Sequence, residues 1–325
     1  MKRQTVFKLL ATLALGLGMG LSAQAQEKAP IKILVGFPPG GSTDLVARLL
    51  AEKMSVVLKQ PIIVDNKPGA GGRMAAQALK ASAPDGLTYM IAPNATPVLQ
   101  TLLYPVEVLK YDMLKDLTPV AVLVTYPLAI AVNTQSGVKN IKEYAAWVKA
   151  NPKEASFGTA GAGGHTHFSG LQLGKAIGQP LQVVPYRGNG PMVTDLLGGQ
   201  IDFGVVALPS VAQHIKSGAL RAIGMCADKR TQAAPDIPTF IEQGLTGYNM
   251  EAWFAVVGPK GMTPAQVKKV HDAVTLAFSD ATVKDTMAKQ GNTINISSAE
   301  HAQKTFRSEM ARYAALVKKA GIEPQ

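Results

Sequence analysis

Three glycine-rich segments of this sequence combine residue types that could hold a small anion. They are Phe37–Asp44 (FPPGGSTD), Gly158–His167 (GTAGAGGHTH) and Pro185–Pro191 (PYRGNGP). Glycines allow several backbone amides to converge on one point, and a helix that begins behind such a loop adds the positive end of its dipole. Each segment therefore predicts a binding site for a group the size of a carboxylate, with an ordinary tight turn and helix cap as the alternative.

The side chains around these glycines offer further hydrogen-bond donors. In the first segment, Ser42 and Thr43 carry hydroxyls, and Asp44 suits either a helix cap or a contact that fixes the loop. In the third segment, Tyr186 offers a phenol and Arg187 a guanidinium, although an arginine beside a loop is often only a solvated charge. These side chains are candidate ligand contacts beside the backbone amides.

Other chemistries find weaker support in the residue patterns. His165 and His167 could begin a metal site, but a metal needs a third and usually a fourth ligand, and no His-Glu-x-x-His helix is present. No Gly-x-Ser-x-Gly elbow marks a hydrolase, and the run Gly69–Gly72 lacks the spacing of a dinucleotide fingerprint. Cys226, the single cysteine, lies in an apolar run that favours a buried structural thiol. We therefore expect no metal and no cofactor, and keep a periplasmic α/β hydrolase as the rival class.

The first 25 residues have the layout of a secretory signal peptide. Lys2, Arg3 and Lys8 precede the apolar stretch 9–21, and the run 23–25 (AQA) forms a small-x-small cleavage site. The apolar stretch is short and glycine-rich for a bilayer span, so an uncleaved anchor is the weaker alternative. We expect cleavage after Ala25 and a periplasmic mature protein.

Charge and length narrow the class of protein further. The chain has 33 basic and 22 acidic residues, for a formal net charge of +11. The basic residues are scattered rather than clustered with aromatics, which disfavours nucleic acid as a partner, and a diffuse positive field favours the approach of small anions. About 300 residues remain after cleavage, which suits two lobes better than one small core.

Short strand patterns alternate with helical ones along the chain, and these elements must position the three segments. The strand patterns cover 31–35, 61–64, 87–91, 121–124, 128–132, 181–184, 201–206 and 251–257. Helical patterns cover 43–58, 73–81 and 141–150, and two capping boxes, Thr263–Gln266 and Ser297–Glu300, begin two long C-terminal helices. This order predicts an α/β fold with mainly parallel sheets flanked by helices. We expect a discontinuous first lobe, 26–124 plus 254–325, a second lobe at 125–253, and a ligand between them.

The order of the motifs resembles the Bug-type periplasmic receptors, the soluble component of tripartite tricarboxylate transporters. The shared stretches are Phe37–Asp44, Asn66–Gly72, Pro84–Gly86, Val184–Gly188, Thr194–Asp202, Leu208–Ser210, Pro235–Thr239 and Trp253–Phe254. The resemblance implies a two-lobed periplasmic binding protein of the type 2, Venus-flytrap kind, which is a receptor and not an enzyme. Its ligand would be a small carboxylate, either a di- or tricarboxylate or an aromatic acid. We expect a monomer that serves the membrane components of such a transporter, with a sensory receptor as the alternative.

The resemblance also implies which residues meet the ligand, mainly through backbone amides and ordered waters. In the first lobe it places Pro39, Gly40, Gly41, Ser42 and Thr43 at the carboxylate, with Asn94 and Thr96 after the third strand. In the second lobe it places Thr159, Ala160, Gly161 and Gly163 there, with His167 at the usual histidine position. From the shared stretches we add Phe37, Asp44, Tyr186, Arg187, Gly188 and Leu208.

One departure from the family pattern bears on the ligand. Val206 stands where many members carry aspartate, and Gly36 stands where proline is common. A carboxylate at position 206 could pair with a cationic group, so its absence argues against an amino-acid ligand. We expect instead a ligand whose distal part is uncharged or apolar.

Overall fold

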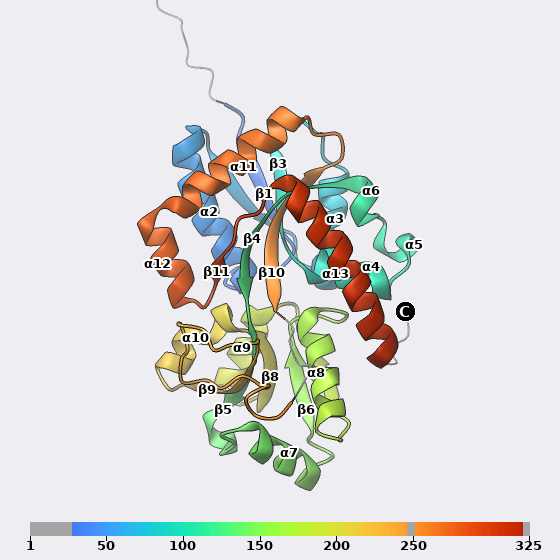
Figure 1. Cartoon of the computed structure of the whole chain (residues 1–325), viewed down its shortest axis with the longest axis vertical. Helices are drawn as coiled ribbons and strands as arrows, with labels where there is room; N and C mark the ends of the chain where they lie inside the picture. Colours follow the sequence, from blue (N-terminus) through green and yellow to red (C-terminus); the bar gives the residue numbers. More distant parts are fainter. Residues whose placement is uncertain (1–27, 246–250, 321–325) are drawn as a thin grey trace, which may run out of the picture.

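The structure is a computed structural model that describes residues 28–245 and 251–320. Two sheets form two lobes, stacked along the long axis of the molecule and joined by strands that pass from one to the other (Figure 1). The expected signal peptide lies outside the described residues. No helix in the described ranges is long and apolar enough to cross a membrane.

The first lobe contains a six-stranded sheet with the strand order β11-β4-β10-β3-β1-β2. Its strands are β1 (Ile31–Val35), β2 (Ile62–Asn66), β3 (Thr88–Pro93), β4 (Leu117–Tyr126), β10 (Ala252–Pro259) and β11 (Thr293–Ile294). Strand β1 pairs in parallel with β2 and β3, whereas β10 runs antiparallel to both β3 and β4.

The second lobe contains a five-stranded sheet with the order β7-β6-β8-β5-β9. Its strands are β5 (Leu128–Asn133), β6 (Ser156–Thr159), β7 (Gln182–Pro185), β8 (Phe203–Ala207) and β9 (Leu220–Cys226). Strand β6 pairs in parallel with β7 and β8, whereas β5 runs antiparallel to β8 and β9. The strand patterns found in the sequence did not include β9.

Each sheet is therefore mixed, so the expectation of mainly parallel sheets was wrong, although the two-lobed α/β architecture is confirmed. The reason is the path of the chain between the lobes. Strands β1, β3, β6 and β8 all end at the boundary between the lobes, so β10 and β5, which carry the chain away from that boundary, must run in the opposite direction.

Helices flank both sheets (Figure 1). The longer ones are α2 (Ser42–Leu58), α3 (Arg73–Lys80), α7 (Ile141–Ala150), α8 (His165–Ala176), α9 (Asn189–Leu197), α10 (Leu208–Lys216), α11 (Pro264–Ser279), α12 (Ala281–Lys289) and α13 (Ala299–Ala320). Three one-turn helices follow β3: α4 (Gln100–Leu103), α5 (Val106–Leu109) and α6 (Met113–Asp116).

The C-terminal part has three helices where the sequence predicted two. The extra break comes from Asp280, whose carboxylate accepts hydrogen bonds from the amides of Thr282 and Val283 and so begins α12. The capping box at the start of α11 is confirmed. At the start of α13 the cap is Ser298 rather than Ser297, because the Ser297 hydroxyl accepts a bond from the β4 backbone instead.

A continuous hydrophobic core runs from the first lobe through β4 and β5 into the second. It includes Leu50 on α2, Val124 on β4 and Phe203 on β8, all at most 2 % exposed. As expected, α13 packs on the first lobe, where Phe306 stacks on Trp253 with ring centroids 4.9 Å apart. Burying a side chain of this size stabilises the fold by about 1.5–3 kcal/mol, so the shared core holds the two lobes in a defined arrangement.

Candidate ligand-binding site

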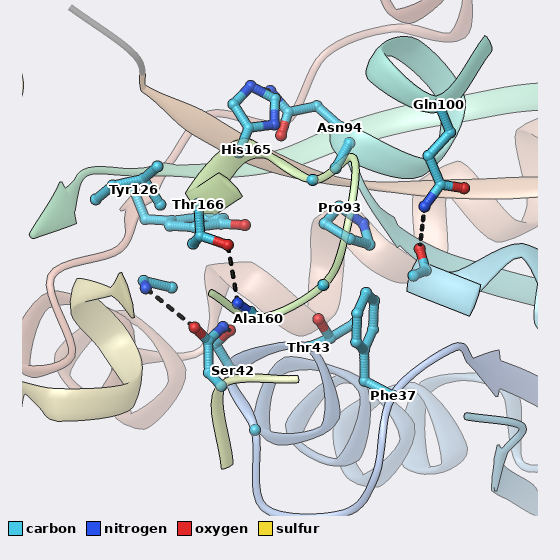
Figure 2. Close-up of a pocket in the computed structure, with 18 residues that line it drawn as sticks. Phe37, Ser42, Thr43, Pro93, Asn94, Gln100, Tyr126, Ala160, His165 and Thr166 are labelled. Carbon is cyan, nitrogen blue, oxygen red and sulfur yellow. Dashed lines mark hydrogen bonds between the residues drawn. The ribbon is translucent and has the colours of Figure 1, made fainter. Parts of the chain in front are cut away.

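A cavity with an empty volume of ≈ 570 Å³ lies between the two lobes, where β1, β3, β6 and β8 end (Figure 2). We call it the inner cavity. Its walls are Phe37, Gly41, Ser42, Thr43, Gly71, Pro93, Asn94, Ala95, Gln100, Tyr126, Leu128, Ala160, Gly161, Gly164, His165, Thr166, Asn189 and Ala207. Its place follows from the fold, because loops at the carboxyl ends of neighbouring strands surround a common crevice.

Helix N-termini from both lobes converge on the inner cavity. Ser42 begins α2, His165 begins α8 and Asn189 begins α9, and all three residues line the wall. The first amides of a helix have no partner within it, and within the described ranges the amides of Ser42 and Thr43 donate to no other residue. These amides and the three helix dipoles make the cavity favourable for an anion.

Asp44 holds the first loop in place from behind rather than lining the cavity. Its carboxylate accepts bonds from the Gly40 amide at 3.0 Å, from Arg48 Nε at 2.8 Å and from Asn66 Nδ2 at 2.9 Å. Burial alone would raise the pKa of Asp44, but these hydrogen bonds and the Arg48 charge outweigh it and keep the pKa below its usual value. Of the two roles considered for Asp44, the structure therefore shows the one that fixes the loop.

Replacing Asp44 with asparagine is expected to lower the free energy of unfolding at pH 7 by about 1–3 kcal/mol, because the charge-assisted bonds are lost. The affinity for ligand should fall with it, because the loop that carries Ser42 loosens. Urea denaturation and calorimetry measure the two effects. Asp285→Asn is the matched control, since Asp285 makes only an exposed pair with Lys289 and should change stability little. An Asp44→Asn protein as stable as the control would contradict the assigned role.

The second loop is shaped by its own threonines and by His167. Thr166 Oγ1 accepts from the Ala160 amide at 3.0 Å and shares a 2.7 Å hydrogen bond with Thr159. The amide of Gly163 donates to His167 Nδ1 at 3.0 Å. The pKa of His167 is lowered by burial, so this ring is neutral and acts as an acceptor. His167 thus fixes the loop, and the neighbouring His165 lines the cavity.

His165 connects the two lobes. Its Nε2 atom lies 3.2 Å from Asn94 Nδ2 and also meets the hydroxyl of Tyr313 on α13 (Figure 2 shows His165 beside Asn94). The pKa of His165 is lowered to about 3, first by burial and second by the nearby charge of Arg312. A neutral imidazole in the second lobe is therefore held between two polar side chains of the first lobe.

Asn189 makes a second link across the lobes. Its Nδ2 donates to Ser42 Oγ at 3.3 Å, and its Oδ1 accepts from the Ala207 amide at 3.3 Å. The backbone at Gly188 has φ +132°, which residues with a side chain rarely adopt, and an added Cβ would lie in ordinary contact with Pro38 and Phe37, at 3.4 and 3.5 Å. Only glycine suits that conformation so close to the first loop. Both links join the two lobes across the cavity.

The residues expected from the sequence divide into three groups. Those that line the inner cavity are Phe37, Gly41, Ser42, Thr43, Asn94, Ala160 and Gly161. Those that lie around it without lining it are Pro39, Gly40, Asp44, Thr96, Thr159, Gly163, His167, Gly188 and Leu208. Tyr186 and Arg187 line a separate hollow nearby.

Several residues that line the inner cavity were not predicted from the sequence. Pro93 and Ala207 are the last residues of β3 and β8, and Ala95 follows β3, so all three could have been found from the rule that ligands bind at the carboxyl ends of strands. Gln100 and Leu128 carried no such signal, because Gln100 comes from a short helix and Leu128 from the strand that leaves the boundary between the lobes.

The chemistry of the inner cavity is that of binding. No acidic, lysine or arginine side chain is among its wall residues. In the part of the chain that the structure describes, no group of three or more His, Cys, Asp or Glu side chains could hold a metal ion. Cys226 is buried, and burial raises the pKa of its thiol. A reactive cysteine needs a lowered pKa, so this thiol is structural.

Two α/β lobes that meet at a cavity walled by helix N-termini define a solute-binding protein of the periplasmic type. A sequence profile described as "Tripartite tricarboxylate transporter family receptor" matches residues 46–322, and the chain belongs to this family. The family consists of periplasmic solute-binding receptors and not enzymes, which removes the hydrolase alternative.

Three relatives illustrate the similarity. Protein BugT of Bordetella pertussis is 32% identical over 321 residues, which cover 97% of this chain and 98% of BugT. The structure of the periplasmic binding protein BugD matches with a TM-score of 0.87 and 32% identity, over 91% of this chain and 99% of BugD. MatC from Rhodopseudomonas palustris, solved with bound malate, matches with a TM-score of 0.84 and 30% identity, over 89% and 98% of the two chains.

Proposed function

We propose that this protein captures a small carboxylate between its two lobes and delivers it to the membrane components of a tripartite tricarboxylate transporter. The observation that carries the proposal is the meeting of the α2, α8 and α9 N-termini at a cavity without an acidic side chain among its wall residues. Backbone amides and dipoles in such a place favour a negative group and oppose a positive one. The malate in the related MatC structure supports a carboxylate ligand.

The lobe bounds carried over from the sequence are residues 26–124 with 254–325, and residues 125–253; in the structure the first sheet extends slightly further, with β4 reaching Tyr126 and β10 beginning at Ala252. The chain passes between them at Pro127, where β4 gives way to β5, and again ahead of β10. A hinge at Pro127 would let the lobes part for ligand entry and close through the His165 and Asn189 links. The protein acts as a monomer in the periplasm after cleavage behind Ala25, in keeping with the layout of its N-terminal sequence.

The inner cavity also limits the ligand. Val206 lies buried in β8 and is not one of the wall residues, and no carboxylate takes the place of the missing aspartate. A ligand ammonium group would find no counter-charge there, which disfavours amino acids. The part of the ligand that enters the inner cavity beyond its carboxylate is uncharged, since it meets Pro93, Tyr126 and Leu128.

A thermal-shift panel of mono-, di- and tricarboxylates and aromatic acids tests the proposal. A ligand at 100 times its dissociation constant adds about 2.7 kcal/mol to the free energy of unfolding, so at least one acid should clearly raise the melting temperature. The primary amide of each active acid is the control, because it keeps the shape and loses the charge. A panel without any stabilising acid, or amides that stabilise equally, would overturn the proposal.

A further inference from the structure

A second hollow lies in the cleft beside the inner cavity. It has an empty volume of ≈ 590 Å³, and we call it the outer hollow. Phe37, Gly71, Ala160 and Gly161 line both spaces, so the two spaces meet at these four residues. Its remaining walls come from both lobes, with Arg73 and Tyr104 from the first and Tyr186 and Arg187 from the second.

The outer hollow differs from the inner cavity in its charge. Two guanidinium groups, Arg73 and Arg187, line it, and no acidic side chain does. Within residues 28–245 and 251–320, neither arginine forms a salt bridge. Two unpaired positive groups that face one hollow from opposite lobes favour an anion between them.

Arg73 is held in position for this role. Its Nε donates to the Ala70 carbonyl at 3.0 Å, and its guanidinium lies over the Tyr104 ring at 4.3 Å from the centroid. Its Nη1 atom is buried and has no hydrogen-bond partner. An unpaired buried donor on a charged group is costly, so the protein's own acceptors do not fully satisfy this guanidinium.

The loop that carries Arg73 adopts an unusual backbone. Ala70 has φ +46°, a left-handed conformation that is rare outside glycine, and Gly71 and Gly72 follow with φ +65° and +94°. A side chain on Gly71 would come within 2.3 Å of Gln100 Nε2. Strain of this kind is stored where a loop clamps a ligand. Here the loop brings Gly71 close to Gly161, where an added Cβ would lie 3.6 Å from the Gly71 Cα atom, and it leads directly into α3, whose first residue is Arg73.

We propose that the outer hollow is a second anion subsite, which takes the distal carboxylate of a dicarboxylate whose first carboxylate lies among the helix N-termini of the inner cavity. The inference rests on the proposed function and names its ligand class. It replaces the expectation of an uncharged distal part: only the part of the ligand inside the inner cavity is uncharged, and the distal end is a carboxylate. A second carboxylate has no cation to meet inside the inner cavity, whereas Arg73 and Arg187 offer two outside it. Since one arginine belongs to each lobe, the bound dicarboxylate also fastens the lobes together.

Calorimetry with matched acids tests the subsite. We would measure a series of α,ω-dicarboxylates of four to eight carbons, and the monocarboxylate of equal length for each, against the wild-type protein, Arg73→Gln and Arg187→Gln. The wild-type protein should prefer at least one dicarboxylate over its monocarboxylate by about tenfold or more. Each substitution should reduce the dicarboxylate affinity by about tenfold and leave the monocarboxylate affinity within about twofold.

Arg307→Gln is the matched control, because Arg307 is exposed on α13 and far along the chain from the hollow. The melting temperature of each ligand-free variant shows whether it remains folded, and the exposed Arg187 provides a test that does not disturb the Ala70 loop. If dicarboxylates and monocarboxylates bind equally and neither substitution matters, the second subsite is wrong while the carboxylate receptor stands. If no acid of either kind binds, the proposed function itself fails.

Discussion

A Gly41→Val protein is expected to fold normally and to bind its carboxylate about a hundredfold more weakly. Gly41 has φ −82° and ψ 167°, an extended conformation that valine adopts without strain. A Cβ atom there would lie 3.7 Å from the amide nitrogen of Gly190 and 3.9 Å from the carbonyl oxygen of Pro38, which are ordinary contacts. The first lobe therefore has room for the first carbon of the new side chain.

The loss of affinity comes from the remaining methyl groups. Gly41 lines the inner cavity beside the first amides of α2 and faces Gly190 of the second lobe. Valine would cover those amides and hold the first and third loops apart, so both the anion contact and lobe closure suffer. Gly41→Ala, which adds only the tolerated Cβ, should lose much less.

Calorimetry and thermal denaturation of the ligand-free proteins measure the two sides of this prediction. The melting temperature should stay within about 2 °C of the wild type, because no buried contact is removed. Ala315→Val, at an exposed position of α13, controls for the addition of the same side-chain bulk. Unchanged affinity in Gly41→Val would remove the first loop from the site.

Ligand affinity is expected to fall about tenfold between pH 7.5 and pH 5.5, through His165. In the closed structure its pKa is lowered to about 3, from an ordinary value of 6.5. Its partners Asn94 and Tyr313 belong to the other lobe, so opening would separate them and let the imidazole reach water. The charge of Arg312 opposes protonation of this ring further, and Arg312 itself pairs with Glu309.

Affinity falls with falling pH because the pKa of His165 is lower in the closed form than in the open form. Above pH 6.5 the ring is neutral in both forms, and closure carries no penalty. Below pH 6.5, His165 is protonated in the open form but stays neutral in the closed form. Closure therefore becomes less favourable by about 1.4 kcal/mol per pH unit until the pH nears 3. The measurement uses a monocarboxylate ligand, because its single carboxyl, with a pKa near 4, stays ionised at pH 5.5 and adds little to this change.

Calorimetry from pH 5.5 to pH 7.5 checks the prediction. A His165→Gln protein should bind with nearly the same affinity at both ends of this range. His301→Gln, which removes an exposed imidazole on α13, should keep the wild-type dependence. His167 stays as it is in both variants, and its bond to Gly163 lies within one lobe and survives opening. A flat wild-type profile, or an unchanged slope in His165→Gln, would contradict the assignment.

The sequence did not predict the different roles of His165 and His167. His165 and His167 stand two residues apart on the same loop, and the family resemblance pointed to His167. The helix that begins at His165 turns the two rings in different directions, so His167 meets its own loop and His165 meets Asn94 and Tyr313. Tyr313 is distant in sequence and gave no sign of this contact.

The sequence by itself determined the α/β alternation, the glycine-rich turns ahead of α2, α8 and α9, and the family, because these depend on local patterns of neighbouring residues. Only the tertiary structure decided which residues form the walls of the inner cavity and that Arg73 and Arg187 share one hollow. Both sets of residues bring together segments that lie far apart in the sequence, such as those of Arg73 and Arg187. Their meeting depends on how the chain passes between the two sheets. Local propensity carries no information on such long-range contacts, which packing of the whole chain determines.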